Sequence, residues 1–410
     1  MMDYSHYLEK QNIPIGEPAK QAHKFAICIP AHLEKDVEDT LSSLAHNIGV
    51  DYSQFVIYLC FNHSESDEGA REIHLQQEQK LRKKLESFPF TIHILQVSMP
   101  VKKAGVGYAR KFAMDTAIAG FQSQNIKDGY LIALDADCIV SENYLSSIAN
   151  YFSVENAPDA ASIYFRHQRK ELFPGHKRAI MKYEMHLRLY RMWQQYMGHP
   201  YANHTVGSAM VCSANAYVKQ GGMNTKKAGE DFYFLNKLMH LGSFGNITQG
   251  MVYPQSRISE RVPFGTGRAM LHASEGSEIR TYNPDIFFHL KWLFLEMRSA
   301  IPNWEKLSPE NQFVIENTDL LHSWNIVNAN TTSADNFKKR LFQTFDLFQL
   351  MKMVHLLRDN FFPNVLIEES YFSYCQLFSK KSQLSLEKQY EHIFKLDKEA
   401  IIEMEQSEFY

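Results

Sequence analysis

Short apolar runs alternate with longer amphipathic segments from Lys24 to about residue 250. Four of these runs are almost continuously apolar and end at a polar or turn residue, as buried strands do: 24–30, 55–61, 91–97 and 130–135. The segments between them place apolar residues three and four positions apart, which predicts helices over 34–47, 67–87 and 105–124. This alternation predicts an α/β fold with a mostly parallel sheet flanked by helices. Ligands of such sheets bind beyond the carboxyl ends of the strands, so we expect the chemistry just after residues 30, 61, 97 and 135.

The pattern changes in the last third of the chain. Segments with helical spacing that are rich in aromatic or charged residues replace the strand pattern there: 285–299, 336–358 and 385–405. The segment 252–284 is polar, basic and contains glycine, so we predict a loop, and loops of this length are often functional. The chain is long enough for more than one hydrophobic core. We therefore predict an N-terminal extension over 1–23, an α/β domain over 24–274 and a helical C-terminal region over 275–410.

The composition is that of a folded globular protein, with 45% hydrophobic and 22% charged residues. A formal net charge of −3 gives no general attraction to nucleic acid, and we expect no nucleic-acid partner. The five cysteines stand far apart, without the spacing of a zinc site or a disulfide framework, which suits a reducing cytoplasm. The most apolar stretch, 286–297, is too short to span a bilayer. We expect no transmembrane span and a cytoplasmic protein, with a peripheral position at the membrane left open.

Two carboxylates follow the fourth predicted strand, in the sequence Asp135-Ala136-Asp137. Hard oxygen ligands suit Mg²⁺ or Mn²⁺, which typically bind one or two carboxylates together with substrate phosphates. Such an ion would neutralise charge on a departing diphosphate. The alternative is that Asp137 or Ser141 only caps a helix that starts near Glu142. The position at the end of a strand favours the metal site.

A second acidic pair, Glu230 and Asp231, follows Gly229 and opens a predicted amphipathic helix. One of the two carboxylates could be a general base that accepts the proton of an attacking hydroxyl group. Acids in the first turn of a helix also complement its dipole, which explains many such pairs without any catalysis. This motif alone leaves both interpretations open.

Basic residues collect in two segments. The segment SRISERVPFGTGR carries three arginines whose guanidinium groups match phosphate oxygens: Arg257, Arg261 and Arg268. A solvated basic loop is the alternative interpretation. A similar group follows the third strand and consists of Lys102, Lys103 and Arg110. His272 could add a ring nitrogen to the metal site, although most histidines are ordinary surface or core residues.

Taken in order, these segments resemble the family 2 glycosyltransferases with the GT-A fold over about residues 24–270. The segments that carry the resemblance are ICIPAHLE, CFNHSES, KKAGVGYARKFA, ALDADC, GGMNTKKAGEDFYF and SRISERVPFGTGR. The family is Rossmann-like and binds its nucleotide at the strand ends, so the resemblance implies a GT-A domain over 24–274. Asn62-His63 departs from the family pattern, which usually has a pair of aspartates at that place. The helices after about residue 275 are not covered by the resemblance.

The resemblance also implies roles for individual residues. Asp231 would be the catalytic base, with Glu230 orienting the acceptor or substituting for the base. Asp137 would ligate the metal directly, and Asp135 would face both the ribose and the metal. The positions implied to bind the nucleotide sugar are Ala31, Glu34, Asn62, Gly105, Arg110, Asp135, Ala136, Arg257 and Arg261.

We therefore expect a metal-dependent glycosyltransferase of the hexosyltransferase type, acting in polysaccharide or glycoconjugate synthesis. The resemblance implies a single displacement with inversion, with Mn²⁺ or Mg²⁺ as cofactor. The donor would be a nucleotide-diphosphate sugar, with a UDP-sugar favoured, and the acceptor a carbohydrate, lipid-linked or other hydroxyl compound. The alternatives are a nucleotidyltransferase and a non-catalytic nucleotide-sugar-binding protein of the same fold. A nucleotidyltransferase normally has a glycine-rich basic loop after the first strand, which PAHLEKD does not supply.

Overall fold

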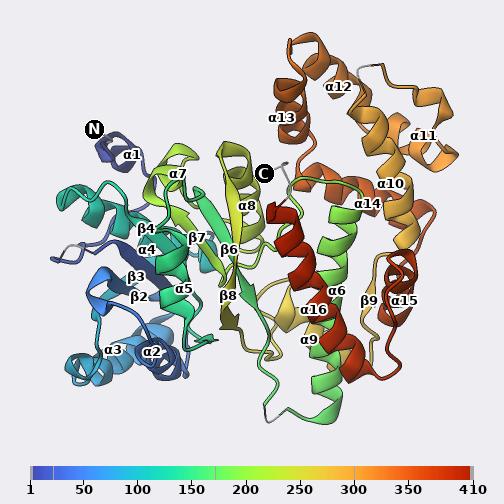
Figure 1. The fold of residues 1–410 in the computed structure, drawn as a ribbon. Coiled ribbons are helices and arrows are strands. Elements are labelled where there is room, and N and C mark those ends of the chain that lie inside the picture. Colours follow the sequence, from blue (N-terminus) through green and yellow to red (C-terminus); the bar gives the residue numbers. More distant parts are fainter. Residues whose placement is uncertain (1–2, 22, 171, 300, 407–410) are drawn as a thin grey trace. The chain divides into compact units, whose positions relative to one another are not determined.

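The computed structural model describes residues 3–21, 23–170, 172–299 and 301–406 (Figure 1). The chain forms two compact units. We call the first, residues 1–168 and 205–265, the sheet unit, and the second, residues 169–204 and 266–410, the helical unit. The division is not that of the sequence-based parts, because 169–204 and 266–274 group with the C-terminal helices. Compactness alone does not delimit a folding domain, so the boundaries at 24–274 and 275–410 stay a prediction.

The sheet unit is built on an eight-stranded sheet with the order β3-β2-β1-β4-β7-β6-β8-β5. Its strands are β1 (Phe25–Ala31), β2 (Phe55–Ser64), β3 (Thr91–Met99), β4 (Tyr130–Ala133), β5 (Ile139–Val140), β6 (Ala160–Phe165), β7 (Met210–Ser213) and β8 (Phe244–Tyr253). Within the described residues four strand pairs are parallel and three are antiparallel. The predicted α/β fold with a mostly parallel sheet flanked by helices is confirmed, and so are the four predicted strands.

The helices of this unit connect and cover the strands (Figure 1). They are α1 (Ser5–Glu9), α2 (Val37–Ala45), α3 (Glu68–Arg82), α4 (Val106–Ser123), α5 (Tyr144–Tyr151), α7 (Ala214–Lys219) and α8 (Glu230–Leu241), with the 3₁₀ turns η1 (Tyr52–Gln54) and η2 (Leu85–Ser87). The three predicted helices correspond to α2, α3 and α4. Because β1 to β4 run parallel, the chain leaves them at one edge of the sheet.

Helix α4 is the central helix of the sheet unit and is buried on nearly all sides. It packs against β1, β2, β3 and β4. Its charged residue Asp115 is fully buried and is satisfied by Lys111, 2.9 Å away, and by the hydroxyl groups of Tyr7 and Tyr217, each 2.7 Å away. Tyr7 belongs to α1, so the predicted N-terminal extension packs on the sheet unit through this buried contact.

The helical unit contains α6 (Pro174–Tyr196), α9 (Thr266–Ser274), α10 (Pro284–Met297), η3 (Trp304–Lys306), α11 (Pro309–Glu316), α12 (Leu320–Ala329), α13 (Ala334–Thr344), α14 (Leu347–Asn360), α15 (Ile367–Leu377) and α16 (Leu386–Gln406). A two-stranded antiparallel sheet joins β9 (Arg280–Thr281) to β10 (Val365–Leu366). Helix α6 lies along α16, which brings a middle segment of the chain against its C-terminal helix (Figure 1). The prediction of helices after residue 280 is confirmed.

One prediction of local structure is wrong. The segment 252–284 is not one loop, because α9 forms within it and buries Met270 against α6. The glycines and arginines of this segment obscured the apolar spacing around Met270. The segment 336–358 is helical as predicted and is divided between α13 and α14, where Asp346 caps α14 by accepting a hydrogen bond from the amide of Gln349.

Candidate active site

The acidic pair after β4 lies in the turn between β4 and β5. The backbone amide of Cys138 donates to the carbonyl of Asp135 at 3.1 Å, which closes the turn, and Thr40 of α2 donates its hydroxyl to the carbonyl of Ala136 at 2.8 Å. These bonds fix the backbone that carries the side chains of Asp135 and Asp137. The alternative that Asp137 or Ser141 caps the next helix is wrong, because α5 begins at Tyr144 and its N-cap residue is Asn143.

Arg110 of α4 joins the two acidic motifs. Its side chain is almost completely buried, and Nη2 lies 2.6 Å from Oδ1 of Asp135, while Nη1 donates to Oε1 of Glu230. Burial opposes the charge of Arg110, but the carboxylates of Asp135, Glu230 and Asp231 together raise its pKa. One guanidinium group therefore holds two carboxylates that stand far apart in the sequence, as a forked donor does well.

The close approach of α4 to the loop before α8 depends on a glycine. A Cβ atom at Gly107 would collide with the backbone carbonyl of Lys226 and would lie 3.1 Å from Cβ of Glu230. Gly229, the N-cap of α8, has φ +71°, a left-handed conformation that glycine adopts without strain. Gly107 on α4 and Gly229 at the start of α8 thus allow the backbone to place Glu230 against Arg110.

Asp231 follows in the first turn of α8. Its Oδ1 accepts a hydrogen bond from the amide of Phe232 at 2.7 Å. Burial and the neighbouring charge of Glu230 raise the pKa of Asp231 to about 7, although Arg110 opposes the shift. A carboxyl group with a pKa near neutrality can exchange a proton at physiological pH, which is the property of a general base or acid.

Arg257 makes a second bridge within the sheet unit. It lies in the loop after β8, and its Nη1 is 2.6 Å from Oε2 of Glu34, while Nη2 is 3.1 Å from Oδ2 of Asp137. Burial and the charge of Asp135 raise the pKa of Asp137 to about 6, against the opposing effect of Arg257. Glu34 follows β1, Asp137 follows β4 and Arg257 follows β8, so the bridge gathers the ends of three strands.

The other residues predicted to bind the nucleotide sugar lie at the same strand ends but form no side-chain ion pairs there, in the part of the chain that the structure describes. Ala31 and Ala136 are buried and offer only backbone groups. Asn62 is buried, and its side-chain oxygen Oδ1 has no hydrogen-bond partner among the described residues. A buried amide oxygen without a partner is costly, which marks a position where a ligand would be accepted. Gly105 is the N-cap of α4.

The predicted basic loop is divided between the two units. Arg257 belongs to the acidic cluster described above, and Arg261 is exposed on the sheet unit. Arg268 and His272 lie on α9 of the helical unit. The structure thus joins Arg257 with Asp137 and Arg110 with Asp135, and it gives Arg261 no contact with these acids.

One residue of the site was missed from the sequence. Gly207 precedes β7, and a Cβ atom there would lie 2.9 Å from Oδ2 of Asp231 and 3.1 Å from Nη1 of Arg110. Only a residue without a side chain therefore fits beside the carboxylate and the guanidinium group. No local pattern in the sequence signals this role, because it depends on the packing of segments that are distant along the chain.

The two carboxylates after β4 fit a hard divalent cation. Asp135 and Asp137 each present two oxygens, and the ion pairs with Arg110 and Arg257 engage one oxygen of each. Burial and the charge of Asp135 outweigh the effect of Arg257 and raise the pKa of Asp137 to about 6, and a bound cation would stabilise its carboxylate form. Across the described residues no group of three or more His, Cys, Asp or Glu side chains is arranged to hold an ion by itself. Two protein carboxylates together with substrate phosphates are the usual ligand set for Mg²⁺.

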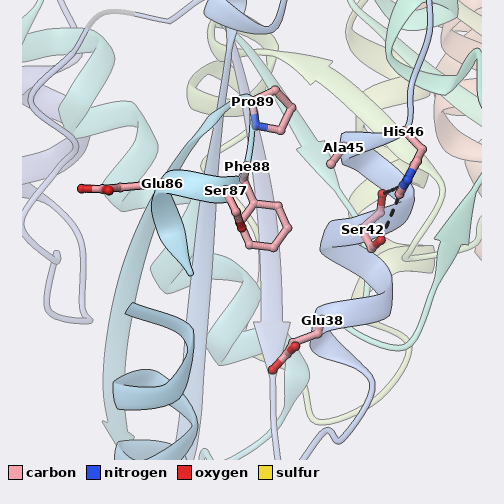
Figure 2. Close-up of a pocket in the computed structure, with 8 residues that line it drawn as sticks. All are labelled: Glu38, Ser42, Ala45, His46, Glu86, Ser87, Phe88 and Pro89. Carbon is pink, nitrogen blue, oxygen red and sulfur yellow. Dashed lines mark hydrogen bonds between the residues drawn. The ribbon is translucent and has the colours of Figure 1, made fainter. Parts of the chain in front are cut away.

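A cavity of about 670 Å³ lies elsewhere on the sheet unit (Figure 2). It is lined by Glu38, Ser42, Ala45 and His46 at α2 and by residues 86–89, which join η2 to β3. Glu38 at this cavity already pairs with Lys80 and Lys84. None of the predicted site residues lines it, so we place the candidate active site at the acidic cluster.

Comparison with known proteins gives only distant likenesses. No protein-family model and no curated protein matches the chain. Among solved structures it is similar to residues 1–349 of TarS from S. aureus in complex with UDP-GlcNAc, with 12% identity, a TM-score of 0.42, and coverage of 88% of this chain and 94% of that chain. It is also similar to the mannosyltransferase PcManGT from Pyrobaculum calidifontis in complex with GDP-Man and Mn²⁺, with 10% identity, a TM-score of 0.36, and coverage of 98% and 91%. At these TM-scores neither likeness identifies the activity. Within the described residues, no helix combines the length and the apolar character that crossing a membrane requires.

Proposed function

We propose that this chain is a glycosyltransferase that moves a sugar from a nucleotide-diphosphate donor to an acceptor hydroxyl group with inversion at the anomeric carbon. The observation that carries the proposal is the double contact of Arg110 with Asp135 and Glu230. It brings the acids expected to meet the donor and the acids expected to meet the acceptor into one cluster at the edge where the parallel strands end. The order of the motifs along the chain, which resembles family 2 glycosyltransferases, gives independent support.

Asp231 is the base in this proposal. The carboxylate of Glu230 is held by Arg110, whereas the carboxyl group of Asp231 has a pKa raised to about 7 by burial and by Glu230. Asp231 would accept the proton of the acceptor hydroxyl as its oxygen forms a bond to the anomeric carbon and the bond from that carbon to the donor diphosphate breaks. Glu230 would keep Arg110 and the start of α8 in position. A positioned base of this kind contributes typically 10²–10⁴ to a rate.

The donor would lie against the ends of β1, β2 and β4. Asn62 would offer its unpartnered Oδ1 to a donor group of a nucleobase, and Glu34, which follows β1, is held in place by Arg257. Asp135 and Asp137 would hold Mn²⁺ or Mg²⁺, which when bound neutralises charge on the diphosphate. Arg257 and Arg261 would hold the phosphate oxygens. The other residues implied to bind the donor are Ala31, Gly105 and Ala136, which lie at the same edge and would contact it through backbone groups.

The donor and acceptor classes follow the sequence resemblance. We propose a UDP-sugar as the favoured donor and a carbohydrate, lipid-linked or other hydroxyl compound as acceptor. A cytoplasmic location with a peripheral position at the membrane is part of the same proposal.

The test is a panel of UDP- and GDP-sugars, measured by thermal shift and by release of the nucleoside diphosphate, each with and without Mn²⁺. A ligand that binds only the folded state raises the melting temperature. We expect at least one nucleotide sugar to stabilise the chain and to be consumed when a hydroxyl acceptor is present. Consumption of a nucleoside triphosphate with release of pyrophosphate would instead support a nucleotidyltransferase. Binding without any consumption across acceptors would support a non-catalytic binding protein.

A further inference from the structure

Four exposed lysines stand beside the acidic cluster on two loops of the sheet unit. Lys102 and Lys103 follow β3, and Lys226 and Lys227 precede α8. We call these four residues the basic rim. A net charge of −3 over the whole chain makes this local accumulation of positive charge a departure from the average surface.

The two loops form one surface. Gly105 lies so close to the second loop that a Cβ atom on it would be 3.1 Å from Cα of Lys227. The ammonium group of Lys227 donates to the backbone carbonyl of Val101 at 3.5 Å. The lysines of the β3 exit and of the α8 entrance are therefore neighbours, although more than a hundred residues separate them in the sequence.

Among the described residues, the lysines of the basic rim form no direct pairs with acids. In the described part of the chain none of the four ammonium groups forms an ion pair. Lys226 lies over the ring of Tyr233, with Nζ 3.5 Å from the ring centroid. Glu65 contacts the first loop through the backbone, because its Oε1 accepts the amide hydrogen of Val101 at 3.4 Å. Exposed like charges repel one another, so a cluster without counter-ions favours binding of an anion.

The second loop of the basic rim is hydrogen-bonded to the backbone of Glu230, the residue before the proposed base. Asn224 accepts a hydrogen bond from the amide of Lys226 at 3.1 Å, and its side-chain nitrogen donates to the carbonyl of Glu230 at 2.8 Å. Lys227 precedes Glu230 by only three residues. A molecule whose hydroxyl group approaches Asp231 would therefore come within reach of the lysine side chains.

We propose that the basic rim binds negatively charged groups of the acceptor, so that the acceptor is an anionic molecule with phosphate or carboxylate groups near its reacting hydroxyl. The inference rests on the proposed function and specifies its substrate class. Lysine is a compact charge on a flexible stem and pairs with either group without demanding a fixed geometry. The residues proposed for the donor lie at the ends of β1, β2, β4 and β8 and include Gly105, which is next to the basic rim. The second loop of the rim leads into the first turn of α8, where Asp231 lies, and this connection assigns the rim to the acceptor.

The experiment compares two four-site variants of the full chain. In the rim variant Lys102, Lys103, Lys226 and Lys227 are changed to Gln. In the control variant four exposed lysines elsewhere on the sheet unit are changed to Gln: Lys20, Lys83, Lys127 and Lys219. Both variants lose the same charge, so a general electrostatic effect acts on both equally. The probes are a polyphosphate chain, a polygalacturonate chain and neutral dextran, with binding measured by fluorescence anisotropy at low and moderate salt.

We expect the wild-type chain to bind at least one of the two anionic polymers, more weakly at higher salt, and not to bind dextran. The rim variant should lose about tenfold or more in that affinity, and the control variant should stay within about twofold of the wild type. Preference for polyphosphate or for polygalacturonate identifies the anionic group. With a transferable acceptor, the rim variant should raise the acceptor KM and leave the donor KM unchanged.

Three results would overturn the inference: no binding of either polymer by the wild type, equal losses in the rim and control variants, or a loss of nucleoside diphosphate binding in the rim variant. The last result would assign the lysines to the donor. The two proposals fail separately. If the wild-type chain binds the polymers through the basic rim but consumes no nucleotide sugar, the proposed function is contradicted and the anion-binding site is still supported.

Discussion

Each unit of this protein buries arginine–carboxylate contacts, but the two sets differ in their balance of charge. In the helical unit Asp397 is fully buried against Arg188 at 2.9 Å and Arg191 at 2.5 Å, with His204 at 2.9 Å. Burial opposes ionisation of Asp397, but Arg191, His204 and Arg188 outweigh it and lower its pKa below the usual range. This carboxylate stays charged and has no proton to exchange near neutrality.

In the sheet unit the acids outnumber the arginines. Two arginines, Arg110 and Arg257, are shared there by five acids: Glu34, Asp135, Asp137, Glu230 and Asp231. The pKa values of Asp137 and Asp231 rise to about 6 and about 7. The contrast shows that burial of ion pairs alone does not identify a functional site. Burial together with an excess of one charge sign leaves a group that can take up a proton or a cation, which is a property expected of a functional site.

The largest expected effect is on catalysis at the unbalanced cluster. Asp231→Asn should lower the rate of sugar transfer by about 10²–10⁴-fold, because the amide cannot accept a proton. Binding of the donor should stay close to that of the wild type, since the proposal assigns Asp231 to the acceptor. Steady-state kinetics and calorimetry with the nucleoside diphosphate measure the two effects. Turnover close to wild type in this variant would reassign the base.

The next largest effect concerns stability at the balanced cluster. Asp397→Asn should lower the free energy of unfolding by about 3–5 kcal/mol, because it removes the buried carboxylate that Arg191 and Arg188 share and leaves Arg188 paired with Glu184. Asp231→Asn removes a surplus negative charge and should not lower the stability at pH 7. Denaturant unfolding of both variants makes the comparison. Equal destabilisation would show that the two clusters are energetically alike.

Changing a proposed metal ligand should weaken donor binding. Asp137→Asn should lower the affinity for a nucleoside diphosphate in the presence of Mn²⁺ by about tenfold to a hundredfold, the range that altered metal environments typically show. Without Mn²⁺ the wild type and the variant should bind alike. Titration calorimetry with and without the ion gives both values. A variant that keeps its Mn²⁺-dependent affinity would remove Asp137 from the metal site.

The pH dependence should report Asp231. Only its carboxylate form can accept a proton, so kcat/KM should rise about tenfold per pH unit up to about pH 7 and then level off. The sign for stability is opposite. Because the folded-state pKa is above the ordinary 3.8, Asp231 stabilises the fold fully below that value and loses this contribution as the pH rises through about 7. The stability of Asp231→Asn relative to wild type should therefore increase from pH 4 to pH 8. A difference that is constant with pH would contradict the raised pKa.

The sequence predicted the part of the site that is local. The strands β1 to β4 are continuous apolar runs, and Asp135 and Asp137 directly follow the fourth, so their place at the sheet edge required no tertiary information. The contacts between Arg110 and both acidic motifs could not be predicted, because they depend on the packing of α4 against the loop before α8. Gly207 was missed for the same reason.

The helical unit was the harder region for sequence reasoning. The aromatic and charged helical spacing after residue 280 predicted its helices, but α6 was not singled out, because it lies within the stretch where strands and helices alternate. Its partner α16 is about 200 residues away in the sequence, and their contact through Arg188, Arg191 and Asp397 is a property of the fold. The glycine-rich and basic character of 252–284 likewise obscured α9.

A direct titration of the aspartate carboxyl groups tests the central claim, that burial and the neighbouring charge of Glu230 leave Asp231 ready to exchange a proton near neutrality. With carboxyl-¹³C-labelled aspartate, NMR spectra of the wild type between pH 4 and pH 9 should show one resonance with a midpoint near 7 that is absent from Asp231→Asn. A spectrum in which no resonance titrates near 7, or in which such a resonance persists in the variant, would contradict the account.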